Sequence, residues 1–153
     1  MPEPVSKEIE HGGQAVLAVD GADGPVVLPV LFVQEKGVLY AVVEAHSLAL
    51  AEAGPDAPVA LTVDHRSRWR ASAMTGVLVR GTGSFQVLSR LRSGRASAER
   101  LVERAGALPD GMALVRIRPH RLVWWKGWAS GTVRLDERGR VSGEPGREPI
   151  WGT

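Results

Sequence analysis

Short apolar segments separated by turn residues make up most of this chain, and in the longest of them apolar and polar positions alternate. That segment is Thr75–Leu88. Its inner face would carry Val77, Val79, Gly81, Gly83, Phe85 and Val87, and its outer face Arg80, Thr82, Ser84 and Gln86. A period of two is typical of a strand with one buried and one wetted face. The two inner glycines would let this long strand coil sharply, as small barrels require.

Other apolar segments predict further strands, because turn residues bound them. They are Gln14–Val19, Val26–Val33, Val38–Val43, Val59–Val63, Leu114–Arg118 and Leu122–Lys126. Glu35-Lys36-Gly37 predicts a hairpin with a short glycine-containing loop. Ser47–Ala53 and Ala96–Ala105 have the pattern and end residues of short helices.

These elements predict a mainly β protein, a six- to seven-stranded antiparallel barrel with two or three short helices. A length of 153 residues fits a single domain. Beyond Val133 the chain is charged and rich in glycine and proline, so we expect a domain over residues 1–133 and an extended tail over residues 134–153.

The amino-acid composition restricts the kinds of site that the protein can contain and its expected cellular location. The chain has no cysteine, which excludes disulfides, thiolate metal sites and a cysteine nucleophile. No apolar run approaches the roughly 18 residues of a membrane span, and the N-terminus lacks the pattern of a signal peptide. We therefore expect a cytoplasmic protein without a membrane partner.

Charge is distributed unevenly along the chain. Residues 1–64 hold two basic and ten acidic side chains, whereas residues 65–153 hold 17 basic and seven acidic ones. In one domain the two halves must either interleave, which we expect, or form a polarised surface with an anion site in the second half.

No motif for catalysis by side chains alone is present. Gly81-Thr82-Gly83 lacks the third glycine of a dinucleotide fingerprint, and Ser130 is misplaced for a nucleophile elbow. The four histidines, at 11, 46, 65 and 120, do not have the spacing of metal ligands, so we expect no metal site. Any chemistry would belong to a bound cofactor.

Four strings in one order carry a resemblance: Gly24–Val33, Gly37–Val42, Val77–Gly81 and Val115–Trp128. The last contains Trp125-Lys126-Gly127 after an Arg-x-x-Pro segment. Over about residues 5–133, this order and spacing resemble the pyridoxamine 5'-phosphate oxidase-like family of FMN-binding split barrels. The resemblance implies a split barrel that forms a homodimer, with an FMN in each of two clefts between subunits and a small-molecule substrate.

The chain departs from the vitamin-producing oxidases where they bind FMN. Val26 and Leu31 replace an Arg and a Lys, and His46-Ser47-Leu48 replaces the Ser-Arg-Lys that holds the phosphate. We therefore do not expect the oxidase activity itself. Either the cluster Arg66, Arg68 and Arg70 replaces the missing cations, or the cofactor is a deazaflavin, which many members of this fold use.

The resemblance implies cofactor-binding residues at these positions: His46, Ser47, Arg66, Arg68, Trp69, Arg70, Trp125 and Gly127. Trp124 and Trp125 would face opposite ways on a strand. The resemblance implies that Trp125 faces the cofactor and Trp124 the core, while the opposite assignment, a register shift of one residue, stays open. An oxidoreductase is the leading interpretation, and a flavin or haem carrier without turnover is the alternative. Nucleic-acid binding is disfavoured, because few aromatic residues lie among the basic ones.

Overall fold

The described part of the protein is made almost entirely of β-strands. The computed structural model describes residues 9–10, 12–21, 23–44, 56–65, 74–87, 101 and 111–146. Its eight strands are β1 (Gly13–Gly21), β2 (Gly24–Glu35), β3 (Val38–Glu44), β4 (Ala57–His65), β5 (Thr75–Val87), β6 (Met112–Lys126), β7 (Ala129–Leu135) and β8 (Val141–Gly146). The expected helix Ser47–Ala53 lies outside the described residues, and of Ala96–Ala105 only Leu101 is described, as a buried helical residue.

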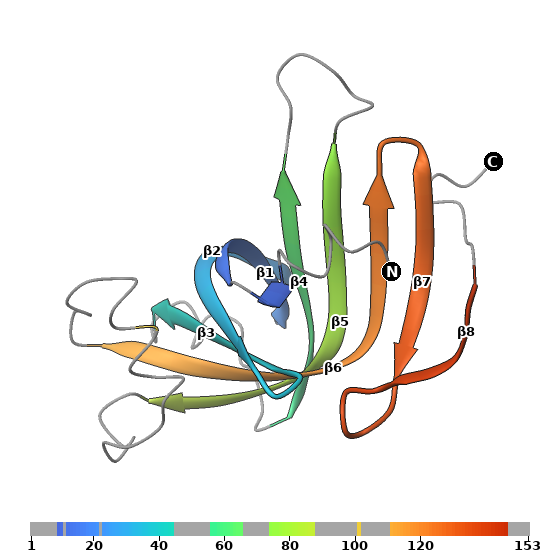
Figure 1. The fold of residues 1–153 in the computed structure, drawn as a ribbon. Helices are drawn as coiled ribbons and strands as arrows, with labels where there is room; N and C mark the ends of the chain where they lie inside the picture. The colour runs from blue at the N-terminus through green and yellow to red at the C-terminus, as the bar shows by residue number, and fades with distance from the viewer. Residues whose placement is uncertain are drawn as a thin grey trace.

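The strands form an antiparallel barrel of six strands with two more attached at one side. The order in the sheet is β3-β2-β1-β4-β5-β6-β7-β8, and β3 also pairs with β6, which closes the barrel (Figure 1). The predicted antiparallel barrel is therefore confirmed. β7 and β8 continue the sheet from β6 outside the closed ring.

The two strands expected around Pro119 are a single strand, β6, so this prediction was wrong. β5 pairs with β6 along its whole length, from Val87↔Ala113 to Thr75↔Lys126, and holds it continuous. The register shifts where Arg80 pairs with Arg121 but Gly81 pairs with Pro119, which leaves His120 as an extra residue. Proline has no N–H to donate to a ladder, and a bulge tolerates this loss.

The bulge marks the place where the barrel splits. Before it, β6 pairs with β3 from Glu44↔Met112 to Leu39↔Ile117. After it, β6 pairs with β7 from Arg121↔Arg134 to Lys126↔Ala129. One long strand thus belongs to the closed barrel at one end and to an open sheet at the other.

Two tight turns lie against each other beside the split. The β2–β3 hairpin has the predicted short loop, in which Lys36 and Gly37 both have positive φ, at 50° and 79°. β8 lies in the segment we expected to be an extended tail, and it pairs with β7. A Cβ added to Gly37 would lie 3.6 Å from the carbonyl oxygen of Arg138, in the β7–β8 turn.

The core lies on the inner faces of the six barrel strands. Val77 and Val79 of β5 are fully buried there, as their alternation predicts. Gly81 and Gly83 allow close packing: a Cβ on Gly81 would collide with the backbone carbonyl of Arg118, and one on Gly83 would lie 2.8 Å from Val59. The coiling expected at these glycines therefore brings β5 close to its neighbours.

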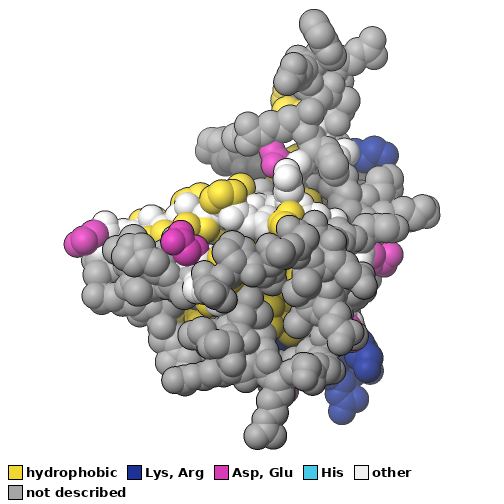
Figure 2. Space-filling model, turned by 90° about the vertical axis from the view of Figure 1, so that its left-hand side faces the viewer, with side chains coloured by type: hydrophobic (Ala, Val, Ile, Leu, Met, Phe, Trp, Pro, Cys, Tyr) yellow, Lys and Arg dark blue, Asp and Glu magenta, His cyan; other side chains and the backbone are white. Residues whose placement is uncertain are grey.

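The described strands of the two oppositely charged halves are segregated in the sheet. β1 to β4 occupy one contiguous block of the sheet and β5 to β8 the other, and the blocks meet only at the β4–β5 and β3–β6 pairings. The interleaving we expected is therefore wrong, because no strand of one half lies between two strands of the other. On the face seen in Figure 2, hydrophobic side chains reach the surface in the middle, basic side chains lie at the right, and acidic side chains lie at both the left and the right.

Candidate functional site

The end of β6 beyond the split carries two adjacent tryptophans on opposite faces. A Cβ on Gly131 of β7 would lie 2.6 Å from Nε1 of Trp124, and a Cβ on Gly76 of β5 would collide with the ring of Trp125. Each indole therefore covers a glycine directly across the ladder, on a different neighbouring strand. The expected opposite orientation is confirmed.

Trp124 is the core residue of the two. It is half-buried and packs against the main hydrophobic cluster. Its Nε1–H is buried, and no acceptor in the described part of the chain lies within hydrogen-bond distance. Trp125 is also half-buried, but on the outer face, so its indole is the one available to a ligand or a partner.

Gly127 fixes the turn that follows these tryptophans. Its φ is 57°, a conformation that favours glycine, and its N–H donates to the Met74 carbonyl at 2.7 Å. This bond ties the β6–β7 turn to the start of β5. The next residue, Trp128, is 81% exposed at the tip of the hairpin.

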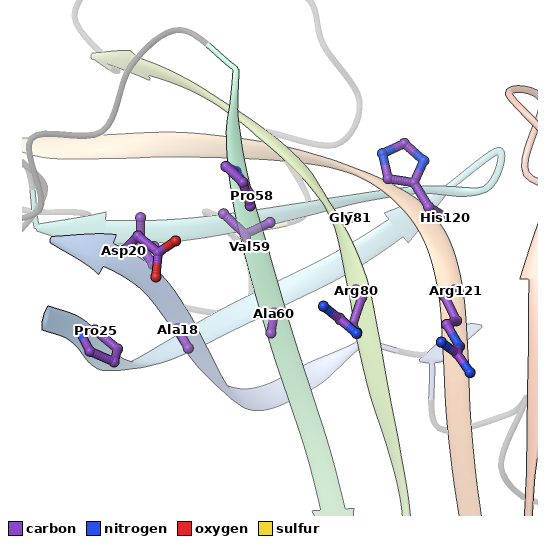
Figure 3. A pocket seen from close by; sticks show the side chains of 11 residues that line it. Ala18, Asp20, Pro25, Pro58, Val59, Ala60, Arg80, Gly81, His120 and Arg121 are labelled. Carbon is purple, nitrogen blue, oxygen red and sulfur yellow. The ribbon is translucent and has the colours of Figure 1, made fainter. Parts of the chain in front are cut away.

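A hollow of about 410 Å³ lies on the outer face of the closed barrel, across β1, β4, β5 and β6 (Figure 3). Ala18, Ala60, Arg80 and Arg121 occupy one level of this face, because each pairs with the next across its ladder. Two alanines therefore form the floor, and two arginines form one wall. Asp20, Pro25 and Pro58 line the other end.

The β6 bulge supplies two consecutive side chains to this face. Both His120 and Arg121 line the hollow, although adjacent residues of a regular strand would point in opposite directions. Nε2 of His120 and Oγ1 of Thr82 are hydrogen-bonded at 2.7 Å. His120 also lines a second hollow of about 250 Å³, between the β2–β3 and β7–β8 turns.

Six of the eight predicted site residues lie outside the described residues: His46, Ser47, Arg66, Arg68, Trp69 and Arg70. The other two, Trp125 and Gly127, lie together at the end of β6. Sequence reasoning missed Arg80, His120 and Arg121. The sequence did contain a signal for the bulge that carries His120 and Arg121. Pro119 lies inside a strand-like segment, and proline within a strand often marks a bulge.

Neither a metal cluster nor a membrane helix is present in the described residues. No group of three or more His, Asp or Glu side chains lies close enough together there to hold a metal ion. No helix in the same part of the chain is long and apolar enough to cross a membrane.

Comparisons with known proteins identify relatives by structure only. No family model matches the chain, and no curated protein matches its sequence. A putative pyridoxamine 5'-phosphate oxidase from Corynebacterium glutamicum is 18% identical with a TM-score of 0.55, over 88% of this chain and 97% of that one. An F420 reductase is 20% identical with a TM-score of 0.56, over 80% and 98%. A haem-binding protein from Mycobacterium smegmatis is 14% identical with a TM-score of 0.58, over 82% and 53%.

These identities are too low to transfer a function, but the TM-scores of 0.56 and 0.55 show a shared fold. The resemblance found in the sequence is confirmed at the level of fold. The chain has the split-barrel fold of the pyridoxamine 5'-phosphate oxidase-like proteins and is a divergent example of it.

Proposed function

We propose that this protein binds a flavin-type cofactor, FMN or a deazaflavin, and acts as an oxidoreductase on a small molecule. The observation that carries the proposal is the placement of Trp125 on the outer face of the open sheet, with its indole against Gly76. Aromatic rings stack on flat ring systems with about 0.5–1.5 kcal/mol beyond burial. Structures with this fold include an F420 reductase and a putative pyridoxamine 5'-phosphate oxidase, which supports this class of cofactor.

In this proposal the residues of the chain bind and orient, and the cofactor supplies electron transfer. Trp125 provides a stacking surface, and Gly127 holds the β6–β7 turn against β5. Arg66, Arg68 and Arg70 are proposed to bind the phosphate, because the usual cationic positions hold Ser47 and Leu48. Charge-assisted bonds to a phosphate are worth about 1.5–3 kcal/mol each.

We further propose that the protein is a cytoplasmic homodimer with the cofactor at the subunit interface. Trp128 and Val141 are 81% and 63% exposed on the hairpins that extend from the barrel. Such side chains gain by burial against a second copy. The segregated charge also supports a two-fold pairing, in which acidic strands of one copy face basic strands of the other.

Reconstitution of the purified protein with FMN, a deazaflavin or haemin tests this function. We expect FMN or the deazaflavin to bind saturably, and changes in the absorbance spectrum of the cofactor measure this binding. The Trp125→Ala variant should weaken cofactor binding about tenfold, equivalent to about 1.4 kcal/mol. The control Val16→Ala, which shortens an exposed hydrophobic side chain on β1, should bind the cofactor like the parent. The Arg68→Ala/Arg70→Ala double variant should weaken FMN binding at least as much.

The same spectra test a second candidate, a haem carrier. His120 is an exposed imidazole on the outer face, and imidazole ligates haem iron. A structure with this fold is a haem-binding protein. Saturable haemin binding that is lost in His120→Ala, with no binding of FMN or the deazaflavin, would replace the first proposal by the second.

A further inference from the structure

We propose that the hollow over Ala18 and Ala60 is a second ligand site, which binds a small phosphate monoester with its phosphate between Arg80 and Arg121. This site is separate from the proposed cofactor site at Trp125. It lies in the described part of the barrel and includes neither the loop arginines nor residues of a second copy.

Three arginines stand in one row on the outer face of the sheet. Arg80 of β5 pairs with Arg121 of β6, and Arg121 pairs with Arg134 of β7. Directly opposed side chains have Cβ atoms about 4.5–5.5 Å apart, and like charges at this distance repel. At this spacing one phosphate dianion can contact both the Arg80 and the Arg121 guanidinium groups, and guanidinium groups bind phosphate oxygens in pairs.

In the same row the side chains become small immediately beside the arginines, which leaves a hollow. Arg80 pairs with Ala60, and Ala60 pairs with Ala18, so two long cationic side chains adjoin two of the smallest apolar ones. This contrast leaves a space of about 410 Å³, within the range of small-molecule sites. An apolar body attached to the phosphate would lie on the alanine floor.

The far end of the hollow selects for a second feature of the ligand. Asp20 lies there between Pro25 and Pro58, at the opposite end from the two guanidinium groups (Figure 3). A carboxylate accepts hydrogen bonds and opposes a second anion. The ligand class is therefore a monoester with a flat or apolar body and, at its other end, a hydroxyl or amino donor.

Titrations with two simple anions, followed by NMR of the labelled protein, test the site. Inorganic phosphate should bind weakly but saturably, with shifts at Arg80 and Arg121. Phenyl phosphate should bind at least fivefold more tightly, because its ring adds contact with the floor. Each of Arg80→Gln and Arg121→Gln should weaken phenyl phosphate at least tenfold, whereas Arg116→Gln, a matched change on the same strand outside the hollow, should not.

Filling the floor separates this site from simple attraction to positive charge. Ala60→Leu should abolish the advantage of phenyl phosphate over inorganic phosphate while inorganic phosphate still binds. Trp125→Ala should leave both anions unaffected, so this test and the test of the cofactor site can fail independently. Melting curves of each variant verify folding, and Arg80→Gln should melt no earlier than the parent.

Three results would overturn the proposal. The first is a linear, non-saturating response that chloride reproduces at equal ionic strength. The second is equal weakening by Arg116→Gln and Arg80→Gln. The third is an advantage of phenyl phosphate that survives in Ala60→Leu, since the ring would then bind elsewhere. If dilution to monomer is required before either anion binds, a second copy of the chain occupies this face and the proposal also fails.

Discussion

The two ends of β6 differ in what surrounds them, although they belong to one strand. From Met112 to Ile117 the strand lies between β5 and β3, with Val115 and Ile117 fully buried in the main core and Leu114 buried in a second cluster on the other face. From Arg121 to Lys126 it lies between β5 and β7, and its outer face carries half-buried Val123 and Trp125. The closed end is buried on both faces, whereas the open end leaves one face partly exposed, and this is the face where we propose that the cofactor binds.

Removing a core side chain at the closed end should have the largest effect. Ile117→Ala should lower the free energy of unfolding by about 4 kcal/mol, because it removes buried methylenes and leaves a cavity. Val123→Ala at the open end should cost only about 1 kcal/mol, since its side chain is half-buried. Chemical denaturation of the two variants measures the difference. Equal losses would mean that the two ends are equally part of the core.

The tryptophan pair should show the same contrast within the open end. Trp124→Ala should cost about 3 kcal/mol, since its indole packs on the main cluster. Trp125→Ala should cost about 1 kcal/mol, because the outer face is partly solvated. Thermal melts with and without FMN compare the variants. A Trp125→Ala protein that melts far earlier yet keeps its full stabilisation by FMN would reverse the roles of the two rings.

A side chain at Gly76 should disturb the outer face specifically. Gly76→Ala should cost about 2 kcal/mol, because the new Cβ collides with the ring of Trp125. In a Trp125→Ala background the same change should cost much less, and the difference is the coupling between the two positions. An unchanged cost in that background would place the strain in the backbone instead of the ring.

The β7–β8 turn should respond to acid with the smallest effect. Asp136 accepts from the N–H of Arg140 at 2.8 Å and of Arg138 at 2.9 Å, and these bonds hold the pKa of its carboxyl below the ordinary value. A lowered folded pKa gives stability that is present above about pH 4 and is lost as the pH falls further. The protection of the Arg138 and Arg140 amides, measured as their exchange rates relative to those of an unstructured peptide at the same pH, should fall below that pH, and in Asp136→Asn it should already be reduced at pH 7.

The sequence predicted the strands well because their alternation reflects burial, and Val77 and Val79 are buried as expected. It divided β6 at Pro119 because the chain itself does not reveal that β5 pairs with β6 past the bulge. The resemblance implied that Trp125 faces outward while the sequence alone left the opposite assignment open, and the structure places Trp125 on the outer face over Gly76. Sequence reasoning overlooked the Arg80–Arg121 pairing, because two positions distant in the chain become neighbours only through strand register. It did not predict the positive φ of Gly127, which fixes the β6–β7 turn.

Closure of the ring at β3 and β6 also sets the order in which the chain can fold. Leu39 and Ile117 are direct neighbours across this pairing, although about half of the chain separates them, whereas β6 and β7 are joined by a two-residue turn. Contacts between distant residues pay the entropy of loop closure before they gain energy, so barrel closure should be the slow, late step. In stopped-flow experiments Ala41→Gly at the seam should mainly accelerate unfolding, and Ser130→Gly in the local hairpin should mainly slow refolding. The reverse pattern would show that the distant seam forms first.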